Sequence, residues 1–332
     1  MLYGIYAVFL CPKKENNNMQ MDNKELEQTK KHYMVDWLKL RVNVNHNPDE
    51  LSAGIRFDLI KEGNGYAEPM KSYKEIWITT PSYDDKLKVK SMKDGSLLIE
   101  GNLGKFLTGQ NVVGESDVIS LVYKTILKLT DMSDYITPTE QQLEAIKKGQ
   151  FKINKIDLNK GLLFESRSEA LQYLERLKFH ASYPRFDKKV ESNGVYFGYN
   201  SKRKTFKYYH KGTEIKVNKK YQKSGNKELQ ALADLMIRCE LRLKWSELND
   251  ANLLDGFSWS PEKVEQLIDD AHNRLTLPKQ ISFPEDLPSK YKRFVSCFKV
   301  GSLVESYTPL TIAKMKRDMM KLYGIDLNNL SF

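Results

Sequence analysis

The sequence predicts an α+β fold: an antiparallel-rich central sheet flanked by helices, followed by a small helical C-terminal domain. Three observations predict it. Runs of alternating apolar and polar residues recur before residue 250, segments with helical spacing of apolar residues lie between them, and helical periodicity alone remains past residue 250. We therefore expect a main domain over 34–250 and a helical domain over 251–332.

Residues 1–33 are expected to be a flexible or non-native N-terminal extension. The stretch 11–33 is polar and rich in Asn, Lys, Glu and Gln, and Met34 offers an alternative natural start. A genuine flexible arm is the other interpretation. The first clear strand follows, because four apolar residues alternate with polar ones: Leu38, Leu40, Val42 and Val44.

The next segments alternate between strands and helices. In order, they are strands over 75–80 and 97–101, a loop through Gly109 and Gly114, a helix over 117–129 with Ser116 as its cap, a strand over 151–159 and a helix over 168–178. This alternation suits a sheet with helices packed against it.

Two hairpin strands and one strongly patterned strand complete the predicted sheet. The hairpin joins 194–199 to 205–215 through a polar turn, and a Lys-rich connector over 216–227 and a helix over 229–236 follow. The last strand, 237–244, alternates most regularly. Its apolar residues face one way, and its charged residues, Arg238, Glu240, Arg242 and Lys244, face the other.

The C-terminal part, 290–332, is predicted to form three short helices. One of them begins with Thr308 as cap and Pro309 in the first turn. It carries the basic residues Lys314, Lys316, Arg317 and Lys321. A compact helical unit with a basic helix suits docking in a DNA major groove. A packed appendage with a solvated basic face explains the same pattern.

Composition favours a polyanionic partner. The 332 residues carry 53 Lys plus Arg against 43 Asp plus Glu, a formal net charge of +10. Nucleic acid is the first candidate, anionic membrane surface the second, and solubility alone the third. The 3 cysteines have no CxxC spacing, so disulfides and zinc are not expected to organise the fold. The apolar start, 2–10, is too short to span a bilayer, so we expect a cytoplasmic protein without membrane contact.

Three distant segments each place reactive side chains on one strand face: 155–157, 208–214 and 238–242. In the second, Tyr209 and Lys211 are expected to be neighbours on one face. A phenol with a pKa of about 10 is a poor nucleophile, and an adjacent ammonium stabilises the phenolate. Together with carboxylates, these groups suit attack of a phenolic oxygen on a phosphodiester. Ordinary sheet packing of tyrosines is the alternative.

Carboxylates on the same face suggest a divalent metal. Asp157, Glu214 and Glu240 belong to neighbouring strands and point away from the apolar layer, so they are candidate oxygen ligands for Mg²⁺ or Mn²⁺. Each is also compatible with a solvated strand face, and Glu240 with an ion pair between two arginines. The sequence lacks GxxxxGK[ST], GxGxxG and HExxH patterns, so ATP, dinucleotide and zinc-protease chemistry are not supported.

Several short segments follow one another along the chain: Met34-Val35-Asp36-Trp37-Leu38, the segment from Lys105 to Gly114, Lys155-Ile156-Asp157, Tyr209-His210-Lys211 with Glu214, the segment from Arg238 to Lys244, and Gly324-Ile325-Asp326-Leu327. In this order they resemble the gene II/X type rolling-circle replication initiators of filamentous phages. The resemblance covers most of the chain from Met34 onward. It implies a fold of the rolling-circle initiator and relaxase type.

The resemblance also implies an activity. Members of that family nick the duplex at the phage origin and stay linked to the 5′ phosphate through a tyrosine. By matching motifs, Tyr209 is the implied nucleophile with Lys211 beside it, and Tyr196 is a second candidate because related plasmid initiators carry a similar Tyr-x-Gly strand. The implied partners are duplex and single-stranded origin DNA, with a host helicase, a polymerase and a single-strand binding protein in the bacterial cytoplasm.

One departure from the family concerns the metal. Where the family often has Gly-His-Asn, this chain has Gly109-Gln110-Asn111; Gln110 offers a carbonyl oxygen to a hard cation but cannot take up a proton. A non-catalytic, sequence-specific DNA-binding regulator is therefore the alternative, and a structural protein with a basic surface the third interpretation. The side chains expected to contact DNA are Lys105, Asn111, Lys155, Lys207, Arg238, Arg242, Lys314 and Arg317.

Overall fold

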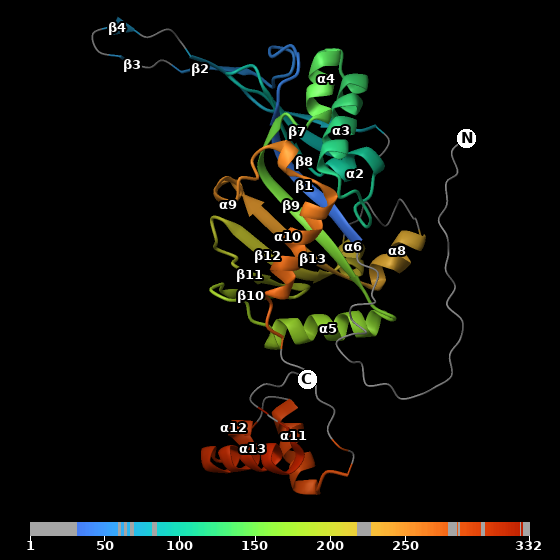
Figure 1. Ribbon diagram of the computed structural model, residues 1–332, viewed down its shortest axis with the longest axis vertical. Coiled ribbons are helices and arrows are strands. Elements are labelled where there is room, and N and C mark those ends of the chain that lie inside the picture. Colours follow the sequence, from blue (N-terminus) through green and yellow to red (C-terminus); the bar gives the residue numbers. More distant parts are fainter. Residues whose placement is uncertain are drawn as a thin grey trace.

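A nine-stranded sheet forms the main body of the computed structural model (Figure 1). The structure describes residues 32–58, 61–62, 65–66, 70–81, 85–217, 227–277, 284, 286–299, 303–325 and 327. All pairs of neighbouring strands are antiparallel, which confirms the predicted sheet. From edge to edge the strands are β10 (Lys188–Glu191), β11 (Gly194–Phe197), β12 (Lys204–His210), β13 (Met236–Lys244), β9 (Phe151–Leu163), β1 (His32–Val42), β8 (Leu97–Gly101), β7 (Lys86–Ser91) and β6 (Ile76–Thr79). Short strands β2 (Ile55–Asp58), β3 (Lys61–Glu62), β4 (Gly65–Tyr66) and β5 (Met70–Tyr73) form two small ribbons.

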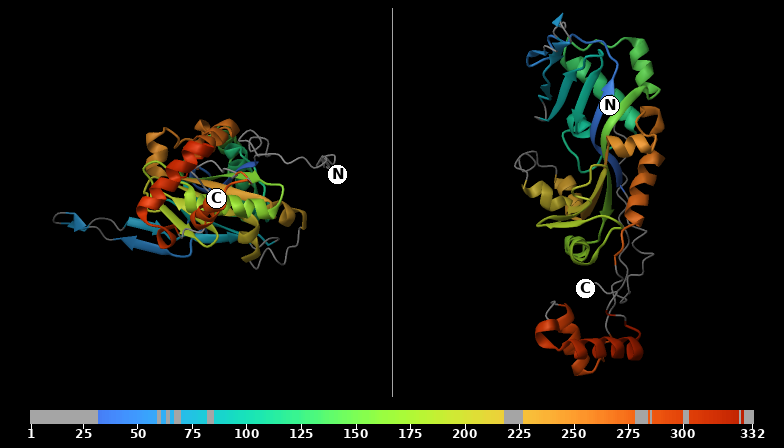
Figure 2. Two further views of the ribbon diagram at one scale, coloured as in Figure 1. Left: turned by 90° about the horizontal axis from the view of Figure 1, so that it is seen from below. Right: turned by 90° about the vertical axis from the view of Figure 1, so that its left-hand side faces the viewer.

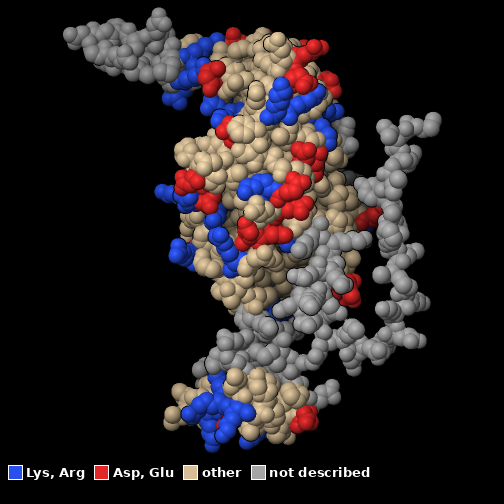
Figure 3. Space-filling model, viewed as in Figure 1, with Lys and Arg blue, Asp and Glu red and all other residues tan. Residues whose placement is uncertain are grey.

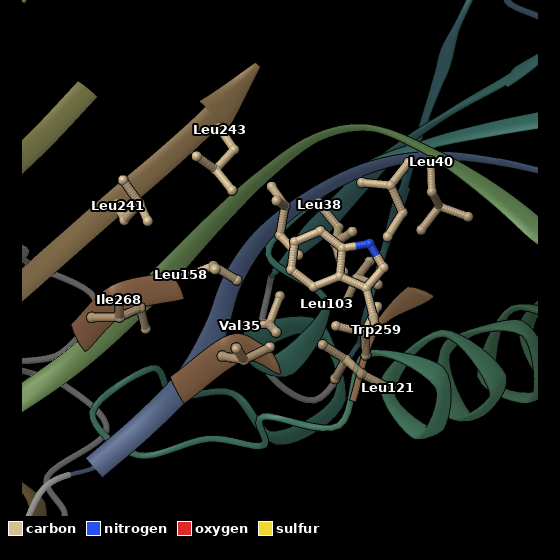
Figure 4. Packing of buried hydrophobic residues seen from close by; sticks show 14 of the residues in the cluster. Val35, Leu38, Leu40, Leu103, Leu121, Leu158, Leu241, Leu243, Trp259 and Ile268 are labelled. Atoms are coloured by element: carbon tan, nitrogen blue, oxygen red, sulfur yellow. The ribbon is translucent and has the colours of Figure 1, made fainter. Parts of the chain in front are cut away.

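One face of the sheet is apolar and lies under helices. Leu38, Leu158 and Leu241 on adjacent strands are buried there, with Leu121 of α3 and Ile268 of α10 against them (Figure 4). This burial follows from period-2 alternation, which puts every second side chain on the same face. The helices are α2 (Leu103–Thr108), α3 (Val118–Met132), α4 (Glu140–Lys147), α5 (Arg167–His180), α9 (Trp245–Asp250) and α10 (Pro261–Asn273), with a 3-10 turn, η1 (Gly256–Ser258).

The opposite face is polar, and it carries the residues singled out by the sequence. The register places Lys207, Glu240 and Asn159 side by side on β12, β13 and β9, and Arg242 opposite Asp157. In the right-hand view of Figure 2 the sheet is nearly edge-on, with α10 along one side only. The polar face therefore carries the candidate catalytic residues of β12, β13 and β9.

Helices α6 (Lys211–Val217) and α8 (Lys227–Asp234) close one end of the polar face. Their apolar residues pack with Val112 and Met236 in a small separate cluster. Gly212 allows the two helices to touch, because a Cβ at that position would lie 2.2 Å from Asp234 Oδ1.

Two element boundaries differ from the prediction. The strand predicted over 205–215 ends at His210, because its ring Nδ1 accepts the N–H of Thr213 at 3.0 Å and so caps α6. Helix α3 is capped by Asp117, which accepts from Ser120 N at 3.0 Å, instead of by Ser116.

The first strand begins earlier than predicted. β1 starts at His32, and the Tyr33 hydroxyl donates to Asp269 of α10 at 2.8 Å, so these two residues belong to the fold rather than to the expected extension. Residues 1–31 lie outside the described residues, as does 218–226 of the predicted connector.

Three helices with their own core follow the sheet, as predicted: α11 (Ser289–Lys299), α12 (Leu303–Ser306) and α13 (Pro309–Tyr323). Thr308 caps α13 by accepting from Thr311 N, and Pro309 is its first residue. The domain boundary at 250/251 falls too early, because Trp259 and α10 pack in the core of the sheet. Among the described residues, no helix is long and apolar enough to cross a membrane.

Candidate active site

Tyr209 lies on the polar face at the end of β12 near α6. Only 4% of it is exposed, and it stands opposite Arg238 of β13, with which it shares a side-chain hydrogen bond. Burial raises the pKa of the Tyr209 phenol well above its usual value, although Arg238 acts in the other direction. The free protein therefore holds a neutral phenol, which needs further help to become a nucleophile.

The second candidate, Tyr196, and the neighbouring Tyr208 lie in different surroundings. Lys207 Nζ lies 4.1 Å from the ring centre of Tyr209 and 5.1 Å from that of Tyr196, so one cation covers both rings on the polar face. Tyr208 points to the helix-covered face, where its hydroxyl meets His272 Nδ1 at 2.6 Å. This position removes Tyr208 from the polar face.

Lys211 reaches the same end of the face from the first residue of α6. It is fully buried, and its Nζ donates to Glu214 Oε2 at 2.6 Å and to Asn111 Oδ1 at 2.9 Å. The expectation that it neighbours Tyr209 along a strand was wrong, because the strand ends first. Burial and the nearby Arg238 lower the pKa of the Lys211 ammonium to about 8, against the attraction of Glu214.

Asp36 joins this group, although we did not single it out from the sequence. β1 bulges between Val35 and Trp37, so Asp36 is an extra residue in the pairing with β9. Its Oδ1 accepts from Asn102 Nδ2 at 2.7 Å and from Asn111 Nδ2 at 3.3 Å. The only available signal was a break in the alternation, with two partly exposed residues between buried Val35 and Leu38.

The loop 109–114 is fixed by Arg238, which was predicted to contact DNA. Arg238 is 1% exposed, and its guanidinium donates to the carbonyl oxygens of Asn111 and Val112, both at 2.6 Å. It therefore holds the loop instead of facing outward. Gln110 is also used inside the loop: its Oε1 accepts from Val112 N at 2.7 Å and its Nε2 donates to Val113 O at 2.9 Å.

The four predicted metal ligands do not meet at one point. Arg242 donates twice to Asp157, at 2.9 and 2.6 Å, while Glu214 pairs with Lys211 and Gln110 serves its own loop. Within the described part of the chain, no three His, Cys, Asp or Glu side chains gather closely enough to hold a metal. Of the predicted set, Glu240 is the carboxylate least engaged by cations, with one Arg242 contact at 3.6 Å.

Glu240 has unusual surroundings for a carboxylate. Burial, and then the negative charge of Asp157, raise its pKa to about 7, while Lys207 acts in the opposite sense. Beside it in the register stands Asn159, which is fully buried and whose Oδ1 and Nδ2 have no hydrogen-bond partner. The negative charge of Asp36 also raises the pKa of Glu240. Glu240 and Asn159 therefore place a carboxyl beside an amide oxygen without a hydrogen-bond partner, and both are oxygen groups of the kind that hard cations bind.

The remaining predicted DNA contacts are spread over the molecule. Lys155 is half-buried beside Trp37, with its Nζ 5.4 Å from the ring centre, and Lys105 pairs with Asp85 at 2.7 Å. Lys314 and Arg317 are exposed on α13, in the helical unit where Figure 3 shows basic side chains gathered. The predicted contacts therefore lie in three places: the polar face, α2 with Lys105, and α13.

Comparison with known proteins identifies the family. A family model for the N-terminal part of the phage gene II type "Replication-associated protein" matches residues 34–263 of this chain. The "Replication-associated protein" of this type from Enterobacteria phage I2-2 is 25% identical over 315 residues, covering 89% of this chain and 88% of that protein. The chain belongs to this family, the gene II/X type initiators of filamentous phages that it resembles in sequence.

A solved structure was also found. The "Structure of Rolling Circle Replication Initiator Protein from Geobacillus stearothermophilus" matches with a TM-score of 0.33 and 12% identity, over 80% of this chain and 96% of that chain.

Proposed function

We propose that the protein is an origin-specific nickase that starts rolling-circle replication through a phosphotyrosine intermediate. The observation that carries the proposal is a group of side chains around Asn111 at one end of the polar face. Lys211 and Asp36 contact the Asn111 side chain, and Arg238, which stands opposite Tyr209, donates to the Asn111 carbonyl oxygen. Glu240 follows Arg238 by two residues on β13. These side chains around Asn111 come from three separate parts of the chain: β1, the junction of β12 with α6, and β13. A phenol, two cations and two carboxylates are the groups that phosphodiester transfer requires.

The reaction exchanges one phosphoester for another. The Tyr209 oxygen bonds to the phosphorus, the bond from phosphorus to the 3′ oxygen breaks, the phenolic proton leaves to water, and the 3′ oxygen takes up a proton. Lys211, with a pKa of about 8, is suited to supply that proton near neutral pH. Because the broken bond is replaced by an equivalent one, no ATP is needed, and the free 3′ hydroxyl can prime synthesis.

Asp36 and Glu240 are the residues that would hold Mg²⁺ or Mn²⁺. Mg²⁺ usually keeps several waters and binds one or two carboxylates together with substrate phosphate, so a pair of acids is sufficient. Asp36 receives hydrogen bonds from two amides, and Glu240 lies beside the unpartnered Asn159. Such an ion, when bound, would offset charge on the phosphate and favour the phenolate.

Origin DNA would contact cations of the polar face and of α13. Phosphate contacts position such a protein, and a few side chains read bases. Single strands, and host helicase, polymerase and single-strand binding protein in the bacterial cytoplasm, are the partners that this role requires.

The test uses supercoiled DNA that carries the intergenic region of the protein's own genetic element, with Mg²⁺ or Mn²⁺. We expect relaxed circles and a covalent adduct that mass spectrometry maps to Tyr209. Tyr209→Phe should abolish both and keep origin binding, while the matched Tyr196→Phe should keep nicking. If Tyr196→Phe alone abolishes the adduct, Tyr196 is the nucleophile.

A DNA-binding regulator without catalysis is the second candidate. The observation in its favour is that Gln110 stands where the family often has a histidine, and that its carboxamide forms hydrogen bonds within its own loop. It predicts tight, salt-sensitive binding with neither nick nor adduct under either metal.

A further inference from the structure

A cavity of about 480 Å³ lies at the other end of the sheet from Tyr209, where β13 ends and β9 begins. This volume is within the range of small-ligand sites. Side chains from β1, from the start of β9, from α9 and from η1 line it, including Arg41, Lys152, Asn154, Trp245 and Phe257. None of these residues takes part in the proposed nicking chemistry.

Two aromatic rings stand exposed in this lining. Trp245 is 54% and Phe257 64% exposed, although both are large apolar side chains that are usually covered. Exposed aromatic rings at a cavity on a basic protein are platforms for stacking of nucleic-acid bases, and such stacking tolerates any base.

Asn154 contributes a hydrogen-bond acceptor without a partner to the lining of the same cavity. β9 has an irregular pairing with β1 at this position, because the register skips from Lys155 to Ile153, and Asn154 is the residue left over. Its Oδ1 is buried and has no hydrogen-bond partner. An acceptor in this state is satisfied by an N–H donor.

The charges at the cavity argue against a phosphate there. Arg41 pairs with Asp94 at 2.6 Å, and Lys152 pairs with Asp255 at 2.5 Å. A phosphate would need cations that are not already paired, and it has no N–H to offer Asn154. The edge of a base offers both an N–H and an aromatic face.

Further cations lie between the cavity and Tyr209. Lys244, Lys155 and Lys39 are aligned across β13, β9 and β1 on the polar face. From Arg238, opposite Tyr209, to Lys244 the strand covers roughly 20 Å at its usual rise. That span is about six nucleotides at the rise of a B-form strand, and fewer in a stretched one.

We propose that this cavity holds one unpaired base of the DNA strand whose phosphate reaches Tyr209, within about six nucleotides of the cut bond. The base stacks on Trp245 and Phe257, and an N–H of its edge satisfies Asn154. This inference rests on the proposed function for the placement of the strand. It adds a site for base binding that is separate from the reacting atoms.

Binding to a single-stranded oligonucleotide from the intergenic region, without divalent metal, tests it. The full chain is titrated against oligonucleotides in which one base at a time is replaced by an abasic site. We expect one position at which the loss of the base weakens binding about tenfold. The free energy of stacking one base on an aromatic side chain is similar to that of a tenfold change in affinity. Trp245→Ala and Phe257→Ala should weaken binding of the intact oligonucleotide by a similar factor and should be insensitive to that abasic site.

Phe179→Ala is the matched control, because Phe179 is 70% exposed on α5, away from the cavity. It should bind, and respond to the abasic site, as the original protein does. Unchanged affinity in the Trp245 and Phe257 variants would overturn the proposal. So would a loss that is equal at every abasic position. Because no metal is present, the result stands whether or not Tyr209 nicks DNA.

Discussion

Lys211 donates from Nζ to Asn111 Oδ1 at 2.9 Å, between residues far apart in the chain. The same Asn111 side chain donates from Nδ2 to Asp36 at 3.3 Å. One amide therefore connects the first residue of α6 with the bulge in β1, and it orients a cation and a carboxylate of the proposed active site together. The DNA contact predicted for Asn111 stays a prediction, whereas its hydrogen bonds to Lys211 and Asp36 are present in the protein alone.

Replacement of Asn111 should disorganise the site without unfolding the protein. We expect Asn111→Ala to slow single-turnover nicking by about tenfold or more, because Lys211 and Asp36 lose a shared partner. The free energy of unfolding should fall by about 1–3 kcal/mol, the usual cost of a buried polar group that loses a partner. Asn200→Ala is the control, since Asn200 is exposed in the β11–β12 turn. Equal rates for the two variants would contradict the role of Asn111.

Nicking should depend on pH with two limbs. Glu240, with a pKa raised to about 7, must be ionised to hold a cation, so the rate should rise as pH increases through about 7. Lys211, with a pKa lowered to about 8, must be protonated, so the rate should fall above about 8. The measurement is kcat/KM against pH at Mn²⁺ well below saturation. A profile that keeps rising to pH 10 would show that the Lys211 proton is not needed.

Asp157 and Glu240 should behave differently towards metal. Asp157 is occupied by two hydrogen bonds from Arg242, whereas Glu240 has only a 3.6 Å contact with it. We expect Glu240→Gln to lower Mn²⁺ affinity by about tenfold or more, while Asp157→Asn changes it little and instead lowers stability by about 1–3 kcal/mol. Calorimetric titration with Mn²⁺ measures the affinities. If Asp157→Asn loses the metal and Glu240→Gln retains it, the ligand assignment is wrong.

The sequence predicted the sheet well because burial of one face imposes a strong alternation. The 237–244 strand illustrates this: Cys239, Leu241 and Leu243 are buried, and Glu240 and Arg242 lie on the polar face as expected. Which polar residues pair was not predictable, because pairing depends on register between strands. The Arg242 pair with Asp157 is set in this way.

The details of the candidate site depended on tertiary contacts. Asp36 reaches the site through a bulge, and a bulge leaves little trace in the alternation. The strand end at His210 depends on a cap by its own ring and on the approach of α8 at Gly212. Burial of Arg238 depends on where the loop 109–114 lies. Patterning within one segment contains none of these contacts.

Helix α13 provides a test of the predicted DNA contact outside the sheet. Lys314 and Arg317 are exposed and three residues apart, so they share one face of the helix. If both contact phosphates, the Lys314→Gln and Arg317→Gln double variant should bind origin duplex more weakly and reduce the slope of log affinity against log salt by about 2. Cleavage of a single-stranded oligonucleotide with the nick site should be unchanged, because α13 contributes no group to the chemistry. The control is the double variant Lys128→Gln with Lys148→Gln, which removes the same charge from the main domain. Lys128 is exposed on α3, and Lys148 is exposed directly after α4. If both double variants change the slope equally, only net charge matters, and α13 is a packed appendage with a solvated basic face.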